Sequence, residues 1–87
     1  MATIIANHKV KDFESWKKIY DSDAPRRIEA GLKELVVGKK SDDPQNVYMI
    51  WQTSNTSIFQ NMMNDPGLRE KMKEAGVTST PEFMILD

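Results

Sequence analysis

The sequence predicts one α+β domain in which strands and helical regions follow the order strand, helix, strand, strand, helix, strand. Two observations predict this class. Four short segments are rich in β-branched and aromatic residues, and two longer segments carry apolar residues at helical spacing. The four glycines all fall at the ends of these segments. A chain of 87 residues fits a single domain, 1–87, because chains shorter than roughly 100 to 150 residues rarely divide.

Residues 3–10 predict the first strand, because the segment begins with β-branched residues and then alternates. The alternation places Ile4, Ala6, His8 and Val10 on one face.

The first helical region follows directly. Asp12 is a typical N-cap residue, and Phe13, Trp16 and Tyr20 recur at a spacing of three and four residues. Pro25 cannot donate to the helical ladder, so we expect a kink or a restart there and a short second piece over residues 26–30. Gly31 suits the left-handed position that ends a helix.

Two strands joined by a polar turn come next, which predicts a hairpin. The first, residues 32–39, contains Leu35, Val36 and Val37 and is expected to be buried. The polar segment 39–46 is expected to form the turn, and residues 47–53 form the second strand.

A second helical region and a last strand complete the chain. Ser54 or Asn55 caps a helix that buries apolar residues up to Met63, and Asp65 with Pro66 starts a further helical piece that stops at Gly76. Residues 83–86 form the last strand.

This order favours a ferredoxin-like βαββαβ fold, a four-stranded antiparallel sheet with two helices on one face. Both faces of the first and third strands are largely apolar, which a lone two-layer domain does not need. A second copy of the chain would cover the free face. A chain this small also needs extra stabilisation, and it has no cysteine for disulfides. We therefore expect a homodimer.

Composition excludes several functions. Twelve basic and thirteen acidic residues give a net charge of −1, without the basic surface that nucleic-acid binding requires. No apolar run is long enough to span a membrane, and no signal segment is evident, so the expected location is the cytoplasm. The single histidine and the lack of cysteine argue against a metal site. The sequence also has no glycine-rich phosphate-binding loop that would indicate a nucleotide site. The expectation is that no cofactor is used.

The segments HKVKDFESWKKIYD (8–21), 26–31, PGLREKMKEAGV (66–77) and PEF (81–83) resemble the dimeric α/β-barrel superfamily, near the antibiotic-biosynthesis-monooxygenase-like proteins. The resemblance covers nearly the whole chain as a pattern and contains no catalytic signature. It implies a ferredoxin-like subunit whose dimer closes two sheets into a barrel. It also implies activities ranging from cofactor-free oxygenation and cyclisation to haem degradation. Family haem sites are often anchored by a helical histidine, which this chain lacks, so haem degradation is not expected.

His8 is the candidate catalytic residue, because it is the only side chain that ordinarily titrates near neutral pH. Near the end of a strand it could act as a general base towards an acidic phenol or carbonyl compound. The alternative is a structural histidine near the end of the sheet.

Trp16, Tyr20 and Trp51 are the candidate pocket walls, with the hydroxyl and indole N–H groups as polar handles. Core packing would use the same residues at the same spacing. The methionines carry the same ambiguity, since they suit either an adaptable cavity or a filled core.

Arg26 and Arg27 follow the expected kink, where one guanidinium could hold an anionic oxygen while the other is solvated. Alternatively, both are surface charges paired with Asp21, Asp23 or Glu29.

Together these observations predict a dimeric α/β-barrel protein that binds a small aromatic or carbonyl-bearing organic molecule. If it is an enzyme, it would resemble a cofactor-independent monooxygenase or cyclase and work by positioning and proton transfer. The alternative is a non-catalytic binding or assembly module whose barrel is filled by side chains.

Overall fold

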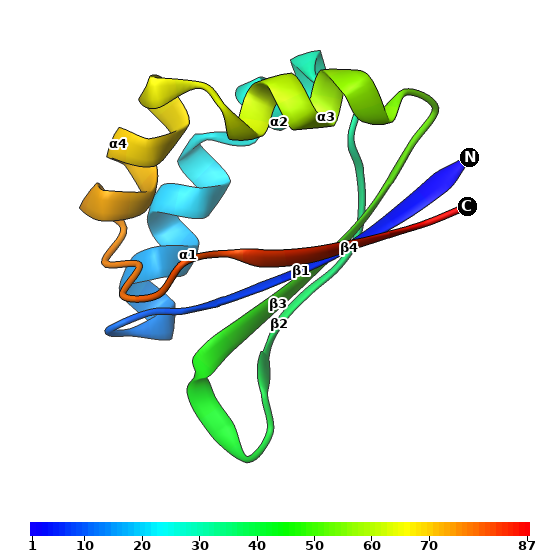
Figure 1. Cartoon of the computed structure of the whole chain (residues 1–87). Helices are drawn as coiled ribbons and strands as arrows, with labels where there is room; N and C mark the ends of the chain where they lie inside the picture. Colours follow the sequence, from blue (N-terminus) through cyan, green and yellow to red (C-terminus); the bar gives the residue numbers. More distant parts are fainter.

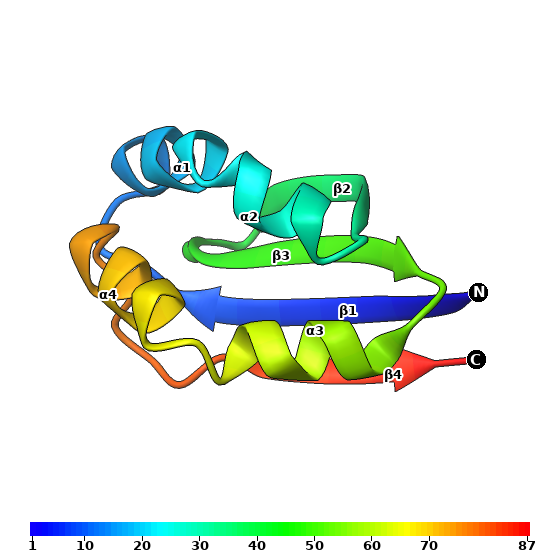
Figure 2. The ribbon, with the colours of Figure 1, turned by 90° about the horizontal axis from the view of Figure 1, so that it is seen from above.

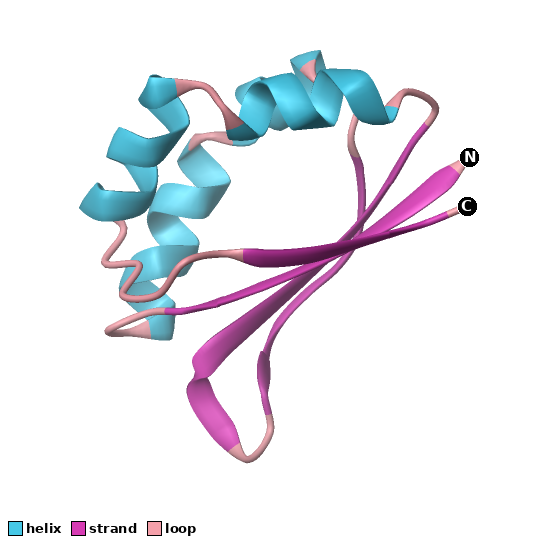
Figure 3. Ribbon diagram, viewed as in Figure 1, coloured by secondary structure: helices cyan, strands magenta, loops and turns pink.

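A computed structural model describes residues 1–87 (Figure 1). The elements, in chain order, are β1 (Ala2–Lys9), α1 (Phe13–Ser22), α2 (Ala24–Glu29), β2 (Lys33–Lys40), β3 (Asp43–Thr53), α3 (Thr56–Met63), α4 (Pro66–Glu74) and β4 (Glu82–Leu86). The four strands form one antiparallel sheet in the order β2-β3-β1-β4. The predicted ferredoxin-like α+β fold is confirmed, with each predicted helical region divided into two helices (Figure 3).

All four helices cover one face of the sheet (Figure 1). Seen from above, α1 and α2 lie towards the β2–β3 side and α3 lies over the β4 side (Figure 2). The core lies between this helical layer and the inner face of the sheet. Its largest fully buried side chains are Phe59, Ile4 and Val10. None of the helices has the length and apolar character needed to cross a membrane.

The helix ends follow from local side-chain chemistry. The Asp12 carboxylate accepts a hydrogen bond from the Ser15 backbone N–H, which satisfies one free donor of the first turn of α1. Asn55, rather than Ser54, caps α3. Pro25 stands in the first turn of α2, where its missing N–H costs no helical bond, so the chain restarts there as predicted. Gly31 follows α2 with φ of 74°, a conformation that other residues rarely adopt.

The hairpin differs from the prediction. β2 extends to Lys40 and β3 begins at Asp43, so the turn is much shorter than the polar segment 39–46. Pro44 is accommodated because it falls in the irregular stretch between the Lys39–Val47 and Lys40–Asp43 pairs, where no regular ladder bond requires its N–H.

The prediction that residues 35–37 are buried is wrong, and only Val37 of the three is even half-buried. Leu35 is 43% exposed and Val36 is 52% exposed. β2 is an edge strand with one neighbour, and Val36 pairs with Ile50 on the face opposite the helices. Leu35 is an extra residue in the ladder, since Glu34 pairs with Trp51 while Val36 pairs with Ile50.

The outer face of the sheet carries one apolar row among polar side chains such as Asn7 and Gln52. Directly paired positions place Val36, Ile50, Ile5 and Met84 in one row across all four strands. Val36 and Met84 at the two edges are more than half exposed. In this single chain nothing covers that row.

Candidate functional site

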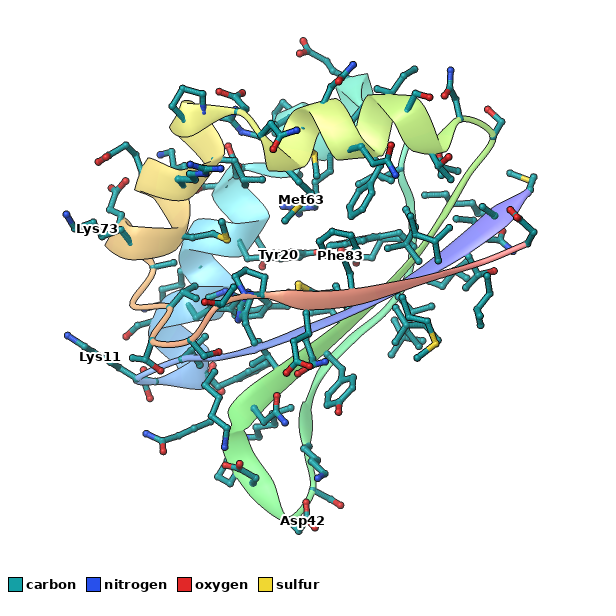
Figure 4. All side chains as sticks on the ribbon, viewed as in Figure 1. Lys11, Tyr20, Asp42, Met63, Lys73 and Phe83 are labelled. Atoms are coloured by element: carbon teal, nitrogen blue, oxygen red, sulfur yellow. The ribbon has the colours of Figure 1, made fainter.

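A cavity of about 70 Å³ lies between the helices and the inner face of the sheet. Aromatic side chains from four elements line it, namely Trp16 and Tyr20 of α1, Trp51 of β3, Phe59 of α3 and Phe83 of β4. Figure 4 shows Tyr20, Met63 and Phe83 pointing into the space between the helices and the sheet. The lining is mostly apolar, with a few polar side chains at defined places.

The aromatic side chains form two groups. In the first, the Trp16 ring stacks on the Tyr20 ring with centroids 4.7 Å apart, and it also contacts an edge-on His8 ring at 5.5 Å and the Phe13 ring at 5.9 Å. In the second, Phe59 packs between Trp51 at 6.0 Å and Phe83 at 5.3 Å. These distances lie in the favourable range for aromatic pairs, so the walls of the cavity are well packed.

His8 lines the cavity and is 5% exposed. Burial lowers the pKa of its imidazole from 6.5 to about 4, so the ring is neutral at physiological pH. Its Nδ1 atom is buried without a hydrogen-bond partner. A buried nitrogen that lacks a partner is costly, and a ligand with a polar group would supply one.

Tyr20 and Trp51 meet in a hydrogen bond, because the indole Nε1 donates to the Tyr20 hydroxyl across 3.0 Å. The hydroxyl in turn donates to Oε1 of Glu34 across 2.9 Å. Burial raises the pKa of Tyr20 well above its usual range, so the phenol keeps its proton. Tyr20 is therefore a neutral polar group in the cavity wall.

Arg27 lines the cavity, and its guanidinium group contacts Tyr20 in two ways. The guanidinium carbon lies 3.5 Å from the centre of the Tyr20 ring, and Nη1 donates to the Tyr20 carbonyl across 2.8 Å. This arrangement combines a cation–π contact with a hydrogen bond and holds α2 against α1.

Arg26 does not line the cavity. Its Nε donates to Asp23 across 3.0 Å, and Nη1 pairs with Asp65, the N-cap residue of α4. This ion pair joins the two halves of the helical layer on its outer side. The structure thus brings five of the six predicted residues together, His8, Trp16, Tyr20, Arg27 and Trp51, and leaves Arg26 outside.

Several lining residues were not singled out by the sequence. Phe59 and Phe83 carry a pattern that predicts only core positions, and Met49, Met62, Met63 and Met72 were ambiguous between cavity and core. Lys71 and Asp23 also reach the lining. No group of three or more His, Asp or Glu side chains is placed to hold a metal ion.

Residues 1–80 match the model of a family described as "Domain of unknown function (DUF3764)". The chain belongs to this family. None of the curated proteins matches the DUF3764 chain.

Solved structures share the fold of this DUF3764 domain at low sequence identity. One is a protein of Bordetella bronchiseptica whose name assigns it provisionally to the antibiotic biosynthesis monooxygenases. It is 12% identical with a TM-score of 0.78, over 99% of this chain and 94% of that one. Another is SnoaB of Streptomyces nogalater, a cofactor-independent oxygenase, which is 14% identical with a TM-score of 0.70 over 95% and 89% of the two chains. A NIPSNAP domain protein of Burkholderia xenovorans is 12% identical with a TM-score of 0.69, over 100% and 93%. The predicted resemblance to antibiotic-biosynthesis-monooxygenase-like proteins is thereby confirmed at the level of the fold.

Proposed function

We propose that this DUF3764 domain binds a small, neutral aromatic or carbonyl-bearing molecule in the cavity between its helices and its sheet. The observation that carries the proposal is His8, a buried and neutral imidazole whose Nδ1 has no partner, in the wall of a mostly apolar cavity. Few, fixed polar groups in an apolar lining are typical of small-molecule sites.

The size of the cavity limits the ligand. An apolar cavity of about 150 Å³ accommodates benzene, and the free volume here is about half of that. A ring enters only if lining side chains move. Methionine is suited to this, because its unbranched side chain has three rotatable bonds, and four methionines line the cavity.

The chemistry proposed for this site is proton transfer without a cofactor. His8 would accept the proton of an acidic hydroxyl or of a carbon next to a carbonyl, which leaves an anionic ligand beside an imidazolium. Because burial disfavours the imidazolium, His8 is a weak base in the free site, and the negative charge of the ligand anion would have to offset that cost. The likeness in fold to SnoaB supports a reaction of the cofactor-independent oxygenase class.

The proposed active unit is a homodimer formed through the outer face of the sheet. The row of Val36, Ile50, Ile5 and Met84 supports this, because it crosses the whole sheet and has no cover within the chain. A two-fold pair of identical faces is self-complementary, so one copy can bury the row of the other.

The second candidate function is a non-catalytic binding or assembly module. The small free volume favours it, because a filled interior needs no ligand. The two functions differ in whether the cavity admits a molecule.

Methionine methyl NMR tests the proposal with phenol as the probe. The cavity methionines are Met49, Met62, Met63 and Met72, whereas Met84 lies on the outer face of the sheet and serves as an internal control. Saturable shifts of the cavity methyl signals with a constant Met84 signal are expected. Unchanged cavity signals at millimolar phenol would favour the assembly module.

A further inference from the structure

Glu34 reaches the site through an irregularity in the sheet. The register places Glu34 opposite Trp51 and Val36 opposite Ile50, with Leu35 as the extra residue between them. In a regular strand, Glu34 and Val36 would share a face. The bulge instead turns Glu34 towards the helices, while Val36 faces outwards. The carboxylate can therefore meet the Tyr20 hydroxyl although β2 is an edge strand.

The direction of each hydrogen bond at Tyr20 is fixed by chemistry. An indole Nε1–H can only donate, so the Tyr20 oxygen accepts from Trp51. An ionised carboxylate can only accept, so the hydroxyl proton points to Glu34. A phenol hydroxyl has one proton and two lone pairs, and after these two bonds one lone pair remains.

Four other polar side chains line the cavity, namely His8, Arg27, Asp23 and Lys71. Neutral His8 has one donor and one acceptor nitrogen, so it suits ligands of either kind. Asp23 pairs with Arg26 and Lys71 pairs with Glu74, while one N–H of Arg27 donates to the Tyr20 carbonyl. Of the two uncharged groups, His8 and Tyr20, only the Tyr20 hydroxyl has its proton directed by a neighbouring side chain, which sets its preference between hydrogen-bond donors and acceptors.

We propose that Glu34 is a specificity-determining residue of this cavity. By holding the Tyr20 proton away from the ligand, it leaves the Tyr20 oxygen as an acceptor. The cavity then takes ligands that bear a hydroxyl or N–H group in preference to ligands that offer only a carbonyl. Glu34 acts through Tyr20 and is a positioning residue. This inference rests on the proposed function and narrows its ligand class.

The test compares phenol, which donates, with acetophenone, which only accepts. Dissociation constants are measured from the cavity methionine methyl shifts in the wild type, Glu34→Leu and Glu34→Gln. Leucine removes the carboxylate acceptor, so no side chain holds the Tyr20 proton and it can turn towards the ligand. Glutamine retains an acceptor oxygen and is the matched control. Glu34 is exposed, so neither substitution disturbs the core.

We expect the wild type to favour phenol and Glu34→Leu to lower the ratio of the two affinities about threefold to tenfold, the range of one neutral hydrogen bond. Glu34→Gln should stay close to the wild type. An unchanged ratio in Glu34→Leu would overturn the assignment, even if both probes bind.

A readout without ligand separates this outcome from failure of the proposed function. The Trp51 indole N–H signal should shift in Glu34→Leu while the Trp16 indole signal stays in place, because the Trp51 indole donates to the Tyr20 hydroxyl and the Trp16 indole does not. If neither probe binds the wild type, the proposed function and the ligand preference both fall. An unmoved Trp51 signal would overturn the Glu34–Tyr20–Trp51 connection itself.

Discussion

The Trp51 indole donates a hydrogen bond to the Tyr20 hydroxyl across 3.0 Å, which ties the third strand to the first helix over 31 residues of sequence. Trp51 is 5% exposed and Tyr20 is 8% exposed. The buried indole N–H and the buried hydroxyl would each cost folding free energy if they lacked a hydrogen-bond partner.

Tyr20→Phe is therefore expected to lower the free energy of unfolding by about 1 to 3 kcal/mol, because it leaves a buried indole N–H without an acceptor. Urea unfolding checks this. Tyr48→Phe is the matched control, since Tyr48 lies half-buried on the outer face and is expected to change stability far less. Equal effects of the two substitutions would contradict the importance of the hydrogen bond.

Stability should depend on pH through His8. The folded pKa is about 4 and the usual value is 6.5, so between these values the unfolded chain binds more protons than the folded chain. The contribution is complete above pH 6.5 and is lost as the pH falls towards 4. One pKa unit corresponds to about 1.4 kcal/mol, so the loss is about 3 kcal/mol.

Urea unfolding at pH 7, 6, 5 and 4.5 measures this loss, with His8→Phe as the variant that keeps a ring against Trp16. The slope between pH 6.5 and 4.5 should largely disappear in the variant. If the free energy of unfolding of the variant still falls with pH as steeply as that of the wild type, other titratable groups cause the pH dependence.

Ile50→Lys is expected to convert the proposed dimer to a monomer. Ile50 lies in the middle of the outer apolar row, and a charge there must be desolvated when two sheets meet. Light scattering should give twice 10.0 kDa for the wild type and 10.0 kDa for the variant. The fold should persist, since the side chain is not part of the inner core. A wild-type monomer would refute the dimer directly.

Arg26→Gln should reduce stability and leave probe affinity unchanged. The substitution removes the local ion pair to Asp23 and the ion pair to Asp65 that joins the two halves of the helical layer. We expect a loss of about 1 to 3 kcal/mol, since these charges are partly buried and hydrogen-bonded. Arg69→Gln on the exposed surface is the control. A large loss of phenol affinity would instead place Arg26 in the binding site.

Ala6→Val should abolish binding of phenol with little effect on stability. Ala6 lies in the cavity wall between Met49 and Phe83, and valine suits a strand while filling part of the free volume. The loss in the free energy of unfolding should not exceed the roughly 1 to 3 kcal/mol that added methyl groups cost in a filled core, because here they enter free volume. Thermal unfolding and the methionine methyl titration measure the two effects. Undiminished phenol binding would place the ligand elsewhere.

The fold was predictable because local chemistry specifies its boundaries. Asp12 and Pro25 act through their own side chains on the adjacent backbone, and Gly31 through its tolerance of positive φ, so their roles are visible in the sequence. The alternation of residues 4–10 likewise identified the inner face of the first strand.

The site was predictable only in part, because it depends on long-range packing. The bulge at Leu35 places Glu34 on the face of the sheet opposite to Val36, and the sequence of the second strand contains no pattern that predicts this bulge. Arg26 and Arg27 are neighbours on a six-residue helix, so periodicity could not tell which one faces the cavity. Free volume is a property of the assembled side chains, which is why a cavity and a filled core share one sequence pattern.

The most direct test of the central claim locates a bound probe by nuclear Overhauser effects between phenol ring protons and the methionine methyl groups. If phenol binds in the cavity, effects are expected to Met49, Met62 and Met72, which line it, and none to Met84 on the outer face. Effects confined to Met84, or none at all at saturating phenol, would contradict ligand binding between the helices and the sheet.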